Sequence, residues 1–486
     1  MIYFSDIFSV DEAVIDSYGA FNISLLNDLP LFVDPFLLYA SDKPEYRQLH
    51  EEILRYLSFL RDKAAAGEIS DAKIARWYKF SEVKQVWFGY SETGNSGSGL
   101  GPSFGRAMSA AILDIFPAAE RESISESIHL EKLGLFRSGV GRDNISDFTC
   151  NLIKGYLLGY TERFACEHLQ PSQCRRFSVP KACFDYRLEE WRDKTYTLPC
   201  FNDDYVLLTP KDILTKDDNW INIADMRKRY FEIVRSVDNS ELRDRINDVY
   251  NHSLPRRRPR SDDRSRAVAR VVQQYPEFMD YYIRLKESRK DEARQQSGKI
   301  VDDAMRFYIG NTTCFISMLS QRGFYDMPES DSFEAARRRI MFMKDVIENQ
   351  DGYKLLYNNG RPVGKERELQ LMFKLTWYAT RFDVNAEVNN GRGPVDFKIS
   401  MGSGDKTLVE FKLAGNTKLR QNLMYQVGVY EKANGTDRSL KVIFYFNEHE
   451  HRRVLEILNE LNLAGDPNII LIDAGADKPS ASNVKM

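Results

Sequence analysis

The sequence contains little cysteine and no long apolar run. Six cysteines occur in 486 residues, five of them between Cys150 and Cys200, and the start, "MIYFSDIFSVDEAVIDS" (1–17), has neither a basic stretch nor a continuous apolar segment. Without a secretion signal, so few cysteines indicate reduced thiols rather than a disulfide framework. No later run approaches the roughly 18 apolar residues that a membrane span needs. We therefore expect a cytoplasmic protein with no membrane partner.

The sequence also lacks an excess of either charge. Lys and Arg number 68 against 71 Asp and Glu, a formal net charge of −3. The overall charge therefore gives no attraction to nucleic acid, and any DNA contact depends on a local basic patch. The hydrophobic fraction of 43% and charged fraction of 29% are typical of a globular protein. At this length we expect two or three domains.

Hydrophobic periodicity predicts a mainly helical N-terminal region. Apolar residues recur at intervals of three and four in 46–67 and in 332–350, as in amphipathic helices. The segments "RRFSVP" (175–180) and "DDYVLLTP" (203–210) predict a few strands among the helices. After about residue 351 short strands alternate with helices. We therefore predict an α+β multidomain chain.

Four segments follow from these patterns. The first (1–254) is a mainly helical region with some strands that senses a signal or holds DNA. It is followed by an Arg-rich linker and helical connector (255–350), a compact C-terminal domain (351–475) and a flexible tail (476–486).

The segment "PRRRPRSDDRSR" (255–266) is rich in arginine. Arginine forks match phosphate oxygens, so Arg256, Arg257, Arg258 and Arg260 are candidates for nucleic-acid binding. The alternative is a solvated loop between two helices.

A glycine-rich loop, residues 94–101, precedes a predicted helix. Its Gly97, Gly99 and Gly101, with Ser103, form a candidate phosphate or ligand loop, because free N–H groups at a helix N-terminus attract anions. No lysine follows the glycines as in a Walker A loop. The alternative is a flexible loop capped by Ser103.

The C-terminal domain places acids where apolar residues are expected. The segment 360–381 predicts a helix with Glu366 at the start of its buried face. The strands "RFDVNAEV", "PVDFKIS" and "TLVEFKLA" follow, the last two joined by the turn "MGSGD". Glu410 and Lys412, two residues apart, share one face of a strand, and a hairpin brings Asp396 beside them. A divalent cation between the two carboxylates would relieve their repulsion.

This order of elements resembles the PD-(D/E)XK nuclease superfamily over about Gly360–Ala474. The resemblance implies an αβββαβ restriction-endonuclease-like core. It implies that Asp396 and Glu410 bind Mg²⁺, for which Mn²⁺ can substitute, and that Lys412 assists the attacking water. Glu366 is the corresponding helix acid.

Two further details concern the same resemblance. The residue before Asp396 is Val395 rather than the family's proline, with Pro394 one place earlier. The helix predicted in 417–435 carries two overlapping Q-x-x-x-Y patterns, of which Gln426 and Tyr430 lie in register with its apolar stripe. The resemblance implies that this Gln and Tyr stand beside the catalytic face.

The resulting hypothesis is a Mg²⁺-dependent hydrolase of phosphodiester bonds. An architecture of a nuclease domain behind a long helical region resembles bacterial restriction and anti-phage (antiviral) effectors. We therefore expect a DNA endonuclease, regulated by its N-terminal region through a small-molecule or phage-derived trigger, that assembles as a homo-oligomer to cut both strands. One alternative is a catalytically silent nuclease fold that binds nucleic acid or partners. Another is a nuclease gated by a nucleotide at residues 94–101.

Overall fold

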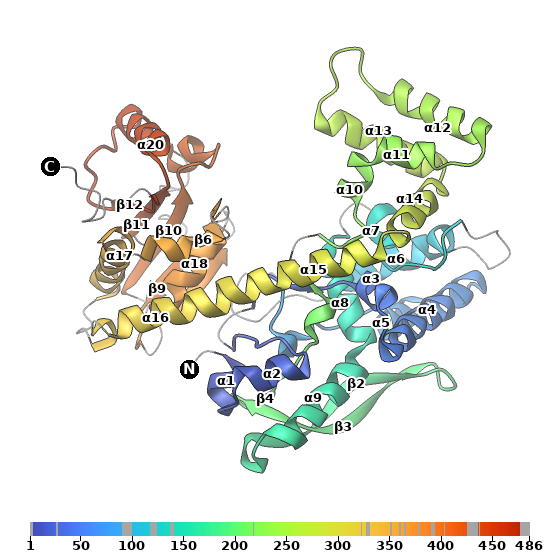
Figure 1. Ribbon diagram of the computed structural model, residues 1–486, viewed down its shortest axis with the longest axis horizontal. Coiled ribbons are helices and arrows are strands. Elements are labelled where there is room, and N and C mark those ends of the chain that lie inside the picture. The colour runs from blue at the N-terminus through green and yellow to red at the C-terminus, as the bar shows by residue number, and fades with distance from the viewer. Residues whose placement is uncertain are drawn as a thin grey trace. The chain divides into compact units, whose positions relative to one another are not determined.

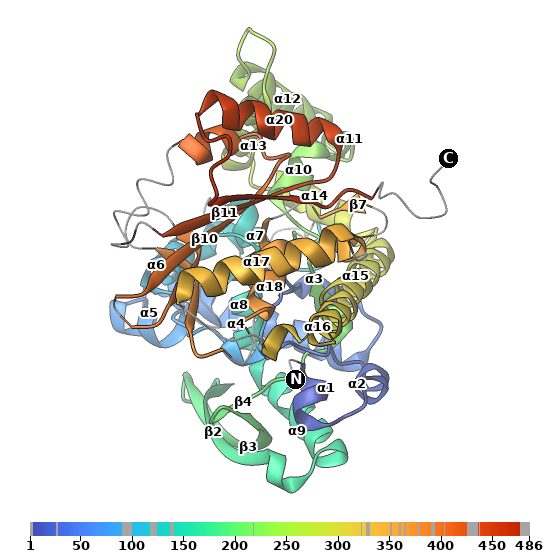
Figure 2. The same cartoon turned by 90° about the vertical axis from the view of Figure 1, so that its left-hand side faces the viewer.

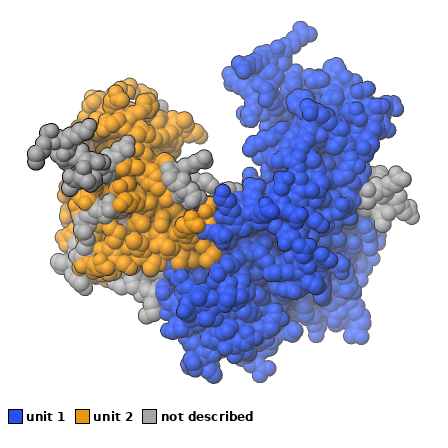
Figure 3. Space-filling model, in the orientation of Figure 1, with its two compact units in different colours: residues 1–90, 95–302 blue, residues 91–94, 303–486 orange. Residues whose placement is uncertain are grey.

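The chain folds into two compact units (Figure 3): residues 1–90 with 95–302 form unit 1, and residues 91–94 with 303–486 form unit 2. The structure is a computed structural model. It describes residues 3–25, 28–89, 100–116, 124–136, 140–216, 218–321, 323–326, 331–349, 352–358, 361–363, 366–377, 380–389, 394–402, 404–424, 436 and 438–476.

Unit 1 is mainly helical (Figure 1). Its described helices are α1 (Phe4–Phe8), α2 (Glu12–Tyr18), α3 (Pro35–Ala40), α4 (Pro44–Ala65), α5 (Asp71–Trp77), α6 (Pro102–Ile115), α7 (Lys132–Phe136), α8 (Arg142–Leu152), α9 (Lys154–His168), α10 (Ile223–Lys228), α11 (Tyr230–Arg235), α12 (Ser240–Ser253), α13 (Ser261–Gln274), α14 (Phe278–Glu287) and most of α15 (Lys290–Met305). Its strands are β1 (Phe32–Val33), β2 (Cys174–Asp185), β3 (Glu190–Phe201), β4 (Asp204–Tyr205) and β5 (Leu214–Thr215). The helical prediction with a few strands is confirmed, although within 203–210 only Asp204–Tyr205 is a strand.

Helix α13 shows why the Arg-rich segment ends where it does. Asp263 Oδ2 accepts a hydrogen bond of 2.9 Å from the N–H of Arg260 and so caps the helix. Val268 and Val271 then repeat on one face and are buried in the core of α10–α14. The segment before the helix is a loop that joins α12 to α13.

Unit 2 is built around a five-stranded mixed sheet with the order β12-β11-β10-β9-β8. Its strands are β6 (Tyr357–Asn358), β7 (Arg361–Pro362), β8 (Asp383–Asn389), β9 (Pro394–Ser400), β10 (Lys406–Leu413), β11 (Ser439–Tyr445) and β12 (Ile469–Asp473), and its described helices, besides the end of α15, are α16 (Thr312–Ser320), α17 (Ser332–Asn349), α18 (Glu366–Leu375) and α20 (Glu448–Glu460). Strands β8, β9 and β10 are antiparallel, whereas β10, β11 and β12 run parallel.

Helices cover both faces of this sheet, and Figures 1 and 2 show α17 and α20 on opposite sides of β11. On the α17 side, Phe373 of α18 packs 5.0 Å from the ring of Phe411 and 5.2 Å from that of Phe397. On the α20 side, Ile443 is buried with Leu419 and other residues. Because β-strand side chains alternate, Glu410 and Lys412 belong to the α20 side, opposite Phe411.

Helix α17 belongs to unit 2. It packs on β9, β10, β11 and β12, and Ser332 at its start donates N–H and Oγ hydrogen bonds to Asp405. The compact units therefore divide after Asp302, whereas the sequence analysis placed 303–350 in the connector. The reason is that the buried face of α17, with Ile340 and Met343, covers this sheet.

None of the described helices is both long enough and apolar enough to cross a membrane. All six cysteines are free thiols.

Candidate functional site

The candidate site lies where β9 and β10 part. The two strands pair from Ser400 opposite Lys406 to Phe397 opposite Val409. Beyond that pair β9 continues along β8, and β10 continues along β11. Asp396 is the first residue of β9 past the pairing, and its Oδ2 accepts a 2.6 Å hydrogen bond from the N–H of Phe411. The carboxylate thus bridges the fork between the strands.

Lys412 stands at the centre of the site. Its side chain is only 8% exposed, and its Nζ lies 3.7 Å from one carboxylate oxygen of each of three acids, Glu366, Asp396 and Glu410. If all three acids were ionised, this one ammonium would not balance their charge. The residues come from three elements, α18, β9 and β10, which the sheet brings together.

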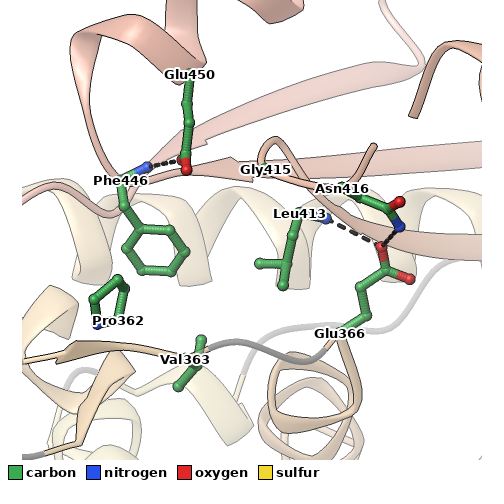
Figure 4. Close-up of a pocket in the computed structure, with 8 residues that line it drawn as sticks. All are labelled: Pro362, Val363, Glu366, Leu413, Gly415, Asn416, Phe446 and Glu450. Atoms are coloured by element: carbon green, nitrogen blue, oxygen red, sulfur yellow. Dashed lines mark hydrogen bonds between the residues drawn. The ribbon is translucent and has the colours of Figure 1, made fainter. Parts of the chain in front are cut away.

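Glu366 is the first residue of α18. Its Oε1 accepts a hydrogen bond of 3.3 Å from the N–H of Leu413 and one of 3.0 Å from Asn416 Nδ2, as Figure 4 shows. The other oxygen, Oε2, is the one near Lys412. Glu366 therefore links the start of α18 to the end of β10. It also adds a third carboxylate beside Lys412, besides those of Asp396 and Glu410.

Burial controls the protonation of the two strand acids. Burial raises the pKa of Asp396, against the opposing charge of Lys412, the hydrogen bond from Phe411 N–H and a hydrogen bond from the side chain of Gln370. Burial likewise raises the pKa of Glu410 to about 7, against the opposing charges of Lys412 and Lys441. Deprotonating both acids is thus costly unless more positive charge is supplied.

The donor set suits a hard divalent cation. No group of three or more His, Cys, Asp or Glu side chains in the described ranges is arranged to hold a metal ion. Mg²⁺, however, uses one or two carboxylates and keeps several waters for its remaining positions. Asp396 and Glu410 supply oxygen ligands only, which favour Mg²⁺ or Mn²⁺ over metals that prefer thiolate or imidazole. Burial is the largest cause of the raised pKa values of both acids, and the charge of Lys412 opposes it.

The structure brings together four residues that were predicted from the sequence: Glu366, Asp396, Glu410 and Lys412. Gln426 and Tyr430 lie outside the described residues. The helix that would carry them is observed from residue 419 to residue 424.

Of the candidate ligand loop, Gly97 and Gly99 lie outside the described residues. Gly101 is the N-cap residue of α6, which begins at Pro102. Ser103 is therefore inside the first turn, and the prediction that it caps the helix is wrong. Glycine without a side chain occupies the N-cap, so no side-chain oxygen caps the helix at this residue.

The four candidate arginines are exposed in the loop between α12 and α13. Arg257 pairs with Asp263 at 2.8 Å, and Arg266 pairs with the same acid at 2.7 Å. The loop thus contains an internal ion-pair network. A role for Arg256, Arg257, Arg258 and Arg260 on phosphate stays a prediction.

Two site residues were missed from the sequence. Lys441 stands opposite Glu410 in the parallel pairing of β10 and β11, and it is buried. A lysine within the apolar run "LKVIFYF" was a usable signal, but its partner depends on the long-range register. Asn416, which holds Glu366, follows β10 in a turn and carries no recognisable pattern.

Two stretches of the chain match family models. Residues 9–222 match a Domain of unknown function (DUF8370), and residues 332–448 match a Domain of unknown function (DUF8371). No curated protein matches the chain, and no solved structure matches it. The chain is thus similar to two domain families of unknown function, and the four residues of the candidate site all lie within the second match.

Proposed function

We propose that unit 2 is a Mg²⁺-dependent nuclease of the PD-(D/E)XK type that hydrolyses phosphodiester bonds in DNA. The observation that carries the proposal is the convergence of three carboxylates on one buried lysine at a fork between two strands. Burying several acids around one lysine is costly for stability alone, and perturbed carboxylates of this kind gather at functional sites.

The order of elements around the site supports the same proposal. Helix α18 precedes β8, β9 and β10, a helical segment begins at residue 419, and β11 follows. This order agrees with the αβββαβ core that the resemblance implies. Helix α20 then follows, and β12 extends the sheet beside β11.

In this mechanism each side chain has a separate task. Bound Mg²⁺ supplies a Lewis acid that polarises the phosphoryl group and lowers the pKa of a water. Asp396 and Glu410 would hold the cation through their carboxylate oxygens. The Lys412 ammonium would donate a hydrogen bond that orients the attacking water, and its charge would stabilise the negative charge that develops on the phosphoryl oxygens. Water adds to phosphorus and releases one proton to solvent, the bond to the leaving oxygen breaks, and that oxygen takes a proton from solvent.

Glu366 acts through Lys412 and through the chain after β10. Its Oε2 faces the ammonium, while its Oε1 is held by Leu413 and Asn416. We therefore regard Glu366 as a positioning residue that keeps Lys412 directed into the fork.

We further propose that unit 1 regulates this activity in a bacterial defence role and that two copies act together on duplex DNA. The support for two copies is that unit 2 carries one candidate site, whereas a double-strand break needs two cleavages.

The experiment is cleavage of supercoiled plasmid, linear duplex, single-stranded DNA and RNA with Mg²⁺, Mn²⁺ or EDTA. The test variants are Glu410→Gln and Lys412→Met, and Lys406→Met on the same strand is the matched control. We expect metal-dependent cleavage in wild type and control, and a loss of at least about a hundredfold in both test variants. If the wild type binds DNA but cleaves none of these substrates, the result would support the silent-fold alternative instead.

A further inference from the structure

A cavity of about 520 Å³ adjoins the candidate site. It lies within the range of about 300–1,000 Å³ that is usual for small-ligand sites. Figure 4 shows the ring of Phe446 at one side of the cavity and the carboxylate of Glu366 at the other, with Leu413 between them. Glu366 therefore belongs to both the cavity and the cluster around Lys412.

The polar walls of the cavity are already fixed by the protein. Asn416 donates to Glu366, and Asn416 Oδ1 accepts a 2.9 Å hydrogen bond from Lys418 N–H. Glu450 Oε2 accepts a 2.8 Å hydrogen bond from Phe446 N–H. Arg453 donates to the backbone oxygens of Ala414 at 2.7 Å and Asn416 at 3.0 Å. The walls are thus held in place before a ligand binds, which lowers the cost of binding.

The charge of the lining selects what can enter. Glu366 and Glu450 line the cavity, and none of the described residues that line it is lysine or arginine. A phosphate would be repelled there, whereas a neutral group with N–H donors is compatible with the carboxylates. The Phe446 ring, with Val363 and Leu413 beside it, offers an apolar and aromatic surface for a flat ring.

We propose that this cavity receives one unpaired nucleobase of the strand that is cut, next to the phosphate at Lys412. The base stacks on Phe446 and presents its N–H edge to Glu450, while its own phosphate stays in the fork. This inference rests on the proposed nuclease function. A paired base cannot enter, so the preferred substrate is single-stranded DNA or a duplex position that is easily unpaired.

Gly415 supports the same assignment, because its lack of a side chain keeps the cavity open. A Cβ at this position would stand 3.2 Å from Glu450 Oε1. A larger side chain would therefore project beside Glu450 and displace a bound base. Gly415→Leu is consequently a variant that fills the cavity and crowds Glu450, while the sequence keeps Glu366, Asp396 and Glu410.

The test uses the full-length protein and single-stranded DNA oligonucleotides that carry one abasic nucleotide at a defined position. Cleavage at each phosphodiester is quantified against the same oligonucleotide with all bases. In wild type we expect cleavage at one of the two phosphodiesters that flank the abasic nucleotide to fall about tenfold, equivalent to about 1.4 kcal/mol. In Phe446→Ala and Gly415→Leu this selective loss should disappear, because these proteins no longer hold a base. Tyr445→Ala, an aromatic neighbour on β11 outside the cavity, should keep it.

The outcomes separate the two proposals. Cleavage of the intact oligonucleotide with no selective loss at the abasic position would overturn the base pocket and leave the nuclease standing. A protein that cuts plasmid or linear duplex but no single-stranded oligonucleotide would overturn the base pocket alone. No cleavage of any of these substrates with Mg²⁺ or Mn²⁺ would overturn the nuclease proposal, and the pocket would fall with it. Because the abasic comparison is made in the wild type, the test does not depend on whether the variants fold.

Discussion

Replacing Lys412 by methionine tests the electrostatic description of the site without any substrate. Each of its three ion pairs spans 3.7 Å, and at an effective dielectric constant of about 20 each is worth about 4 kcal/mol before the desolvation of the ammonium is subtracted. Removing one partner of a buried ion pair costs about 3–5 kcal/mol, because the charge left behind is uncompensated. We therefore expect Lys412→Met to lower the free energy of opening of β10 by about 3 kcal/mol at pH 8.

The sign of the pH dependence follows from the carboxyl groups. Without Lys412 the folded-state pKa values of Asp396 and Glu410 rise further above their unfolded values, and Glu410 starts at about 7. The folded variant then keeps protons that the unfolded chain loses, so its stability falls as the pH rises. At pH 5 Glu410 is largely neutral, and the deficit against wild type should shrink to about 1 kcal/mol. Added Mg²⁺ at ten times its Kd should restore about 1.4 kcal/mol.

The assay is native-state hydrogen exchange of peptides from β10 and β11, corrected for the intrinsic exchange rate at each pH. It reports unit 2 alone, whereas global unfolding of a two-unit chain is not a single transition. The control variant Lys406→Met replaces another lysine of the same strand. It should change the free energy of opening by less than about 0.5 kcal/mol. A deficit under about 1 kcal/mol at pH 8, or an equal deficit at both pH values, would refute the reasoning.

Three further predictions concern unit 2. In wild type without divalent cations, the raised pKa of Glu410 should make stability fall as the pH rises from about 4.5 to about 7, and Glu410→Gln should flatten this part of the profile in the same exchange assay. Arg453→Ala removes the donors to Ala414 and Asn416 and should cost about 1–3 kcal/mol, measured by exchange of peptides after β10; an unchanged rate would contradict the role of Arg453. Phe373→Ala should lower the free energy of opening by about 3–5 kcal/mol in the same measurement, because the fully buried ring of Phe373 contacts two rings of the sheet. A loss below about 1 kcal/mol would contradict this ring packing.

The sequence was informative about the site where the signal was local. In a strand, side chains two residues apart share a face, so Glu410 and Lys412 could be paired from their spacing alone. Asp396 followed from one short hairpin, and Glu366 from the helical period. These inferences needed no knowledge of how distant strands meet.

Features that depend on distant contacts could not be predicted in the same way. Lys441 faces Glu410 only through the parallel register of β10 and β11, which local periodicity does not determine. The cavity combines residues from segments before α18, after β10 and after β11. Helix α17 was recognised as amphipathic, but its pattern does not say which surface its apolar face covers, and the predicted boundary at 351 accordingly differs from the division after Asp302.

The fork between β9 and β10 has a consequence for the choice of an inactive variant. Asp396 accepts the N–H of Phe411 where the pairing of the strands has ended, so the same carboxylate that would hold a cation also ties the two strands together. Substituting Asp396 by alanine would leave that N–H without its partner and loosen the sheet as well as the site. Lost activity in such a protein would therefore mix a chemical defect with a structural one, whereas Glu410 carries no hydrogen bond between the strands of the fork in the described structure and gives the cleaner inactive protein.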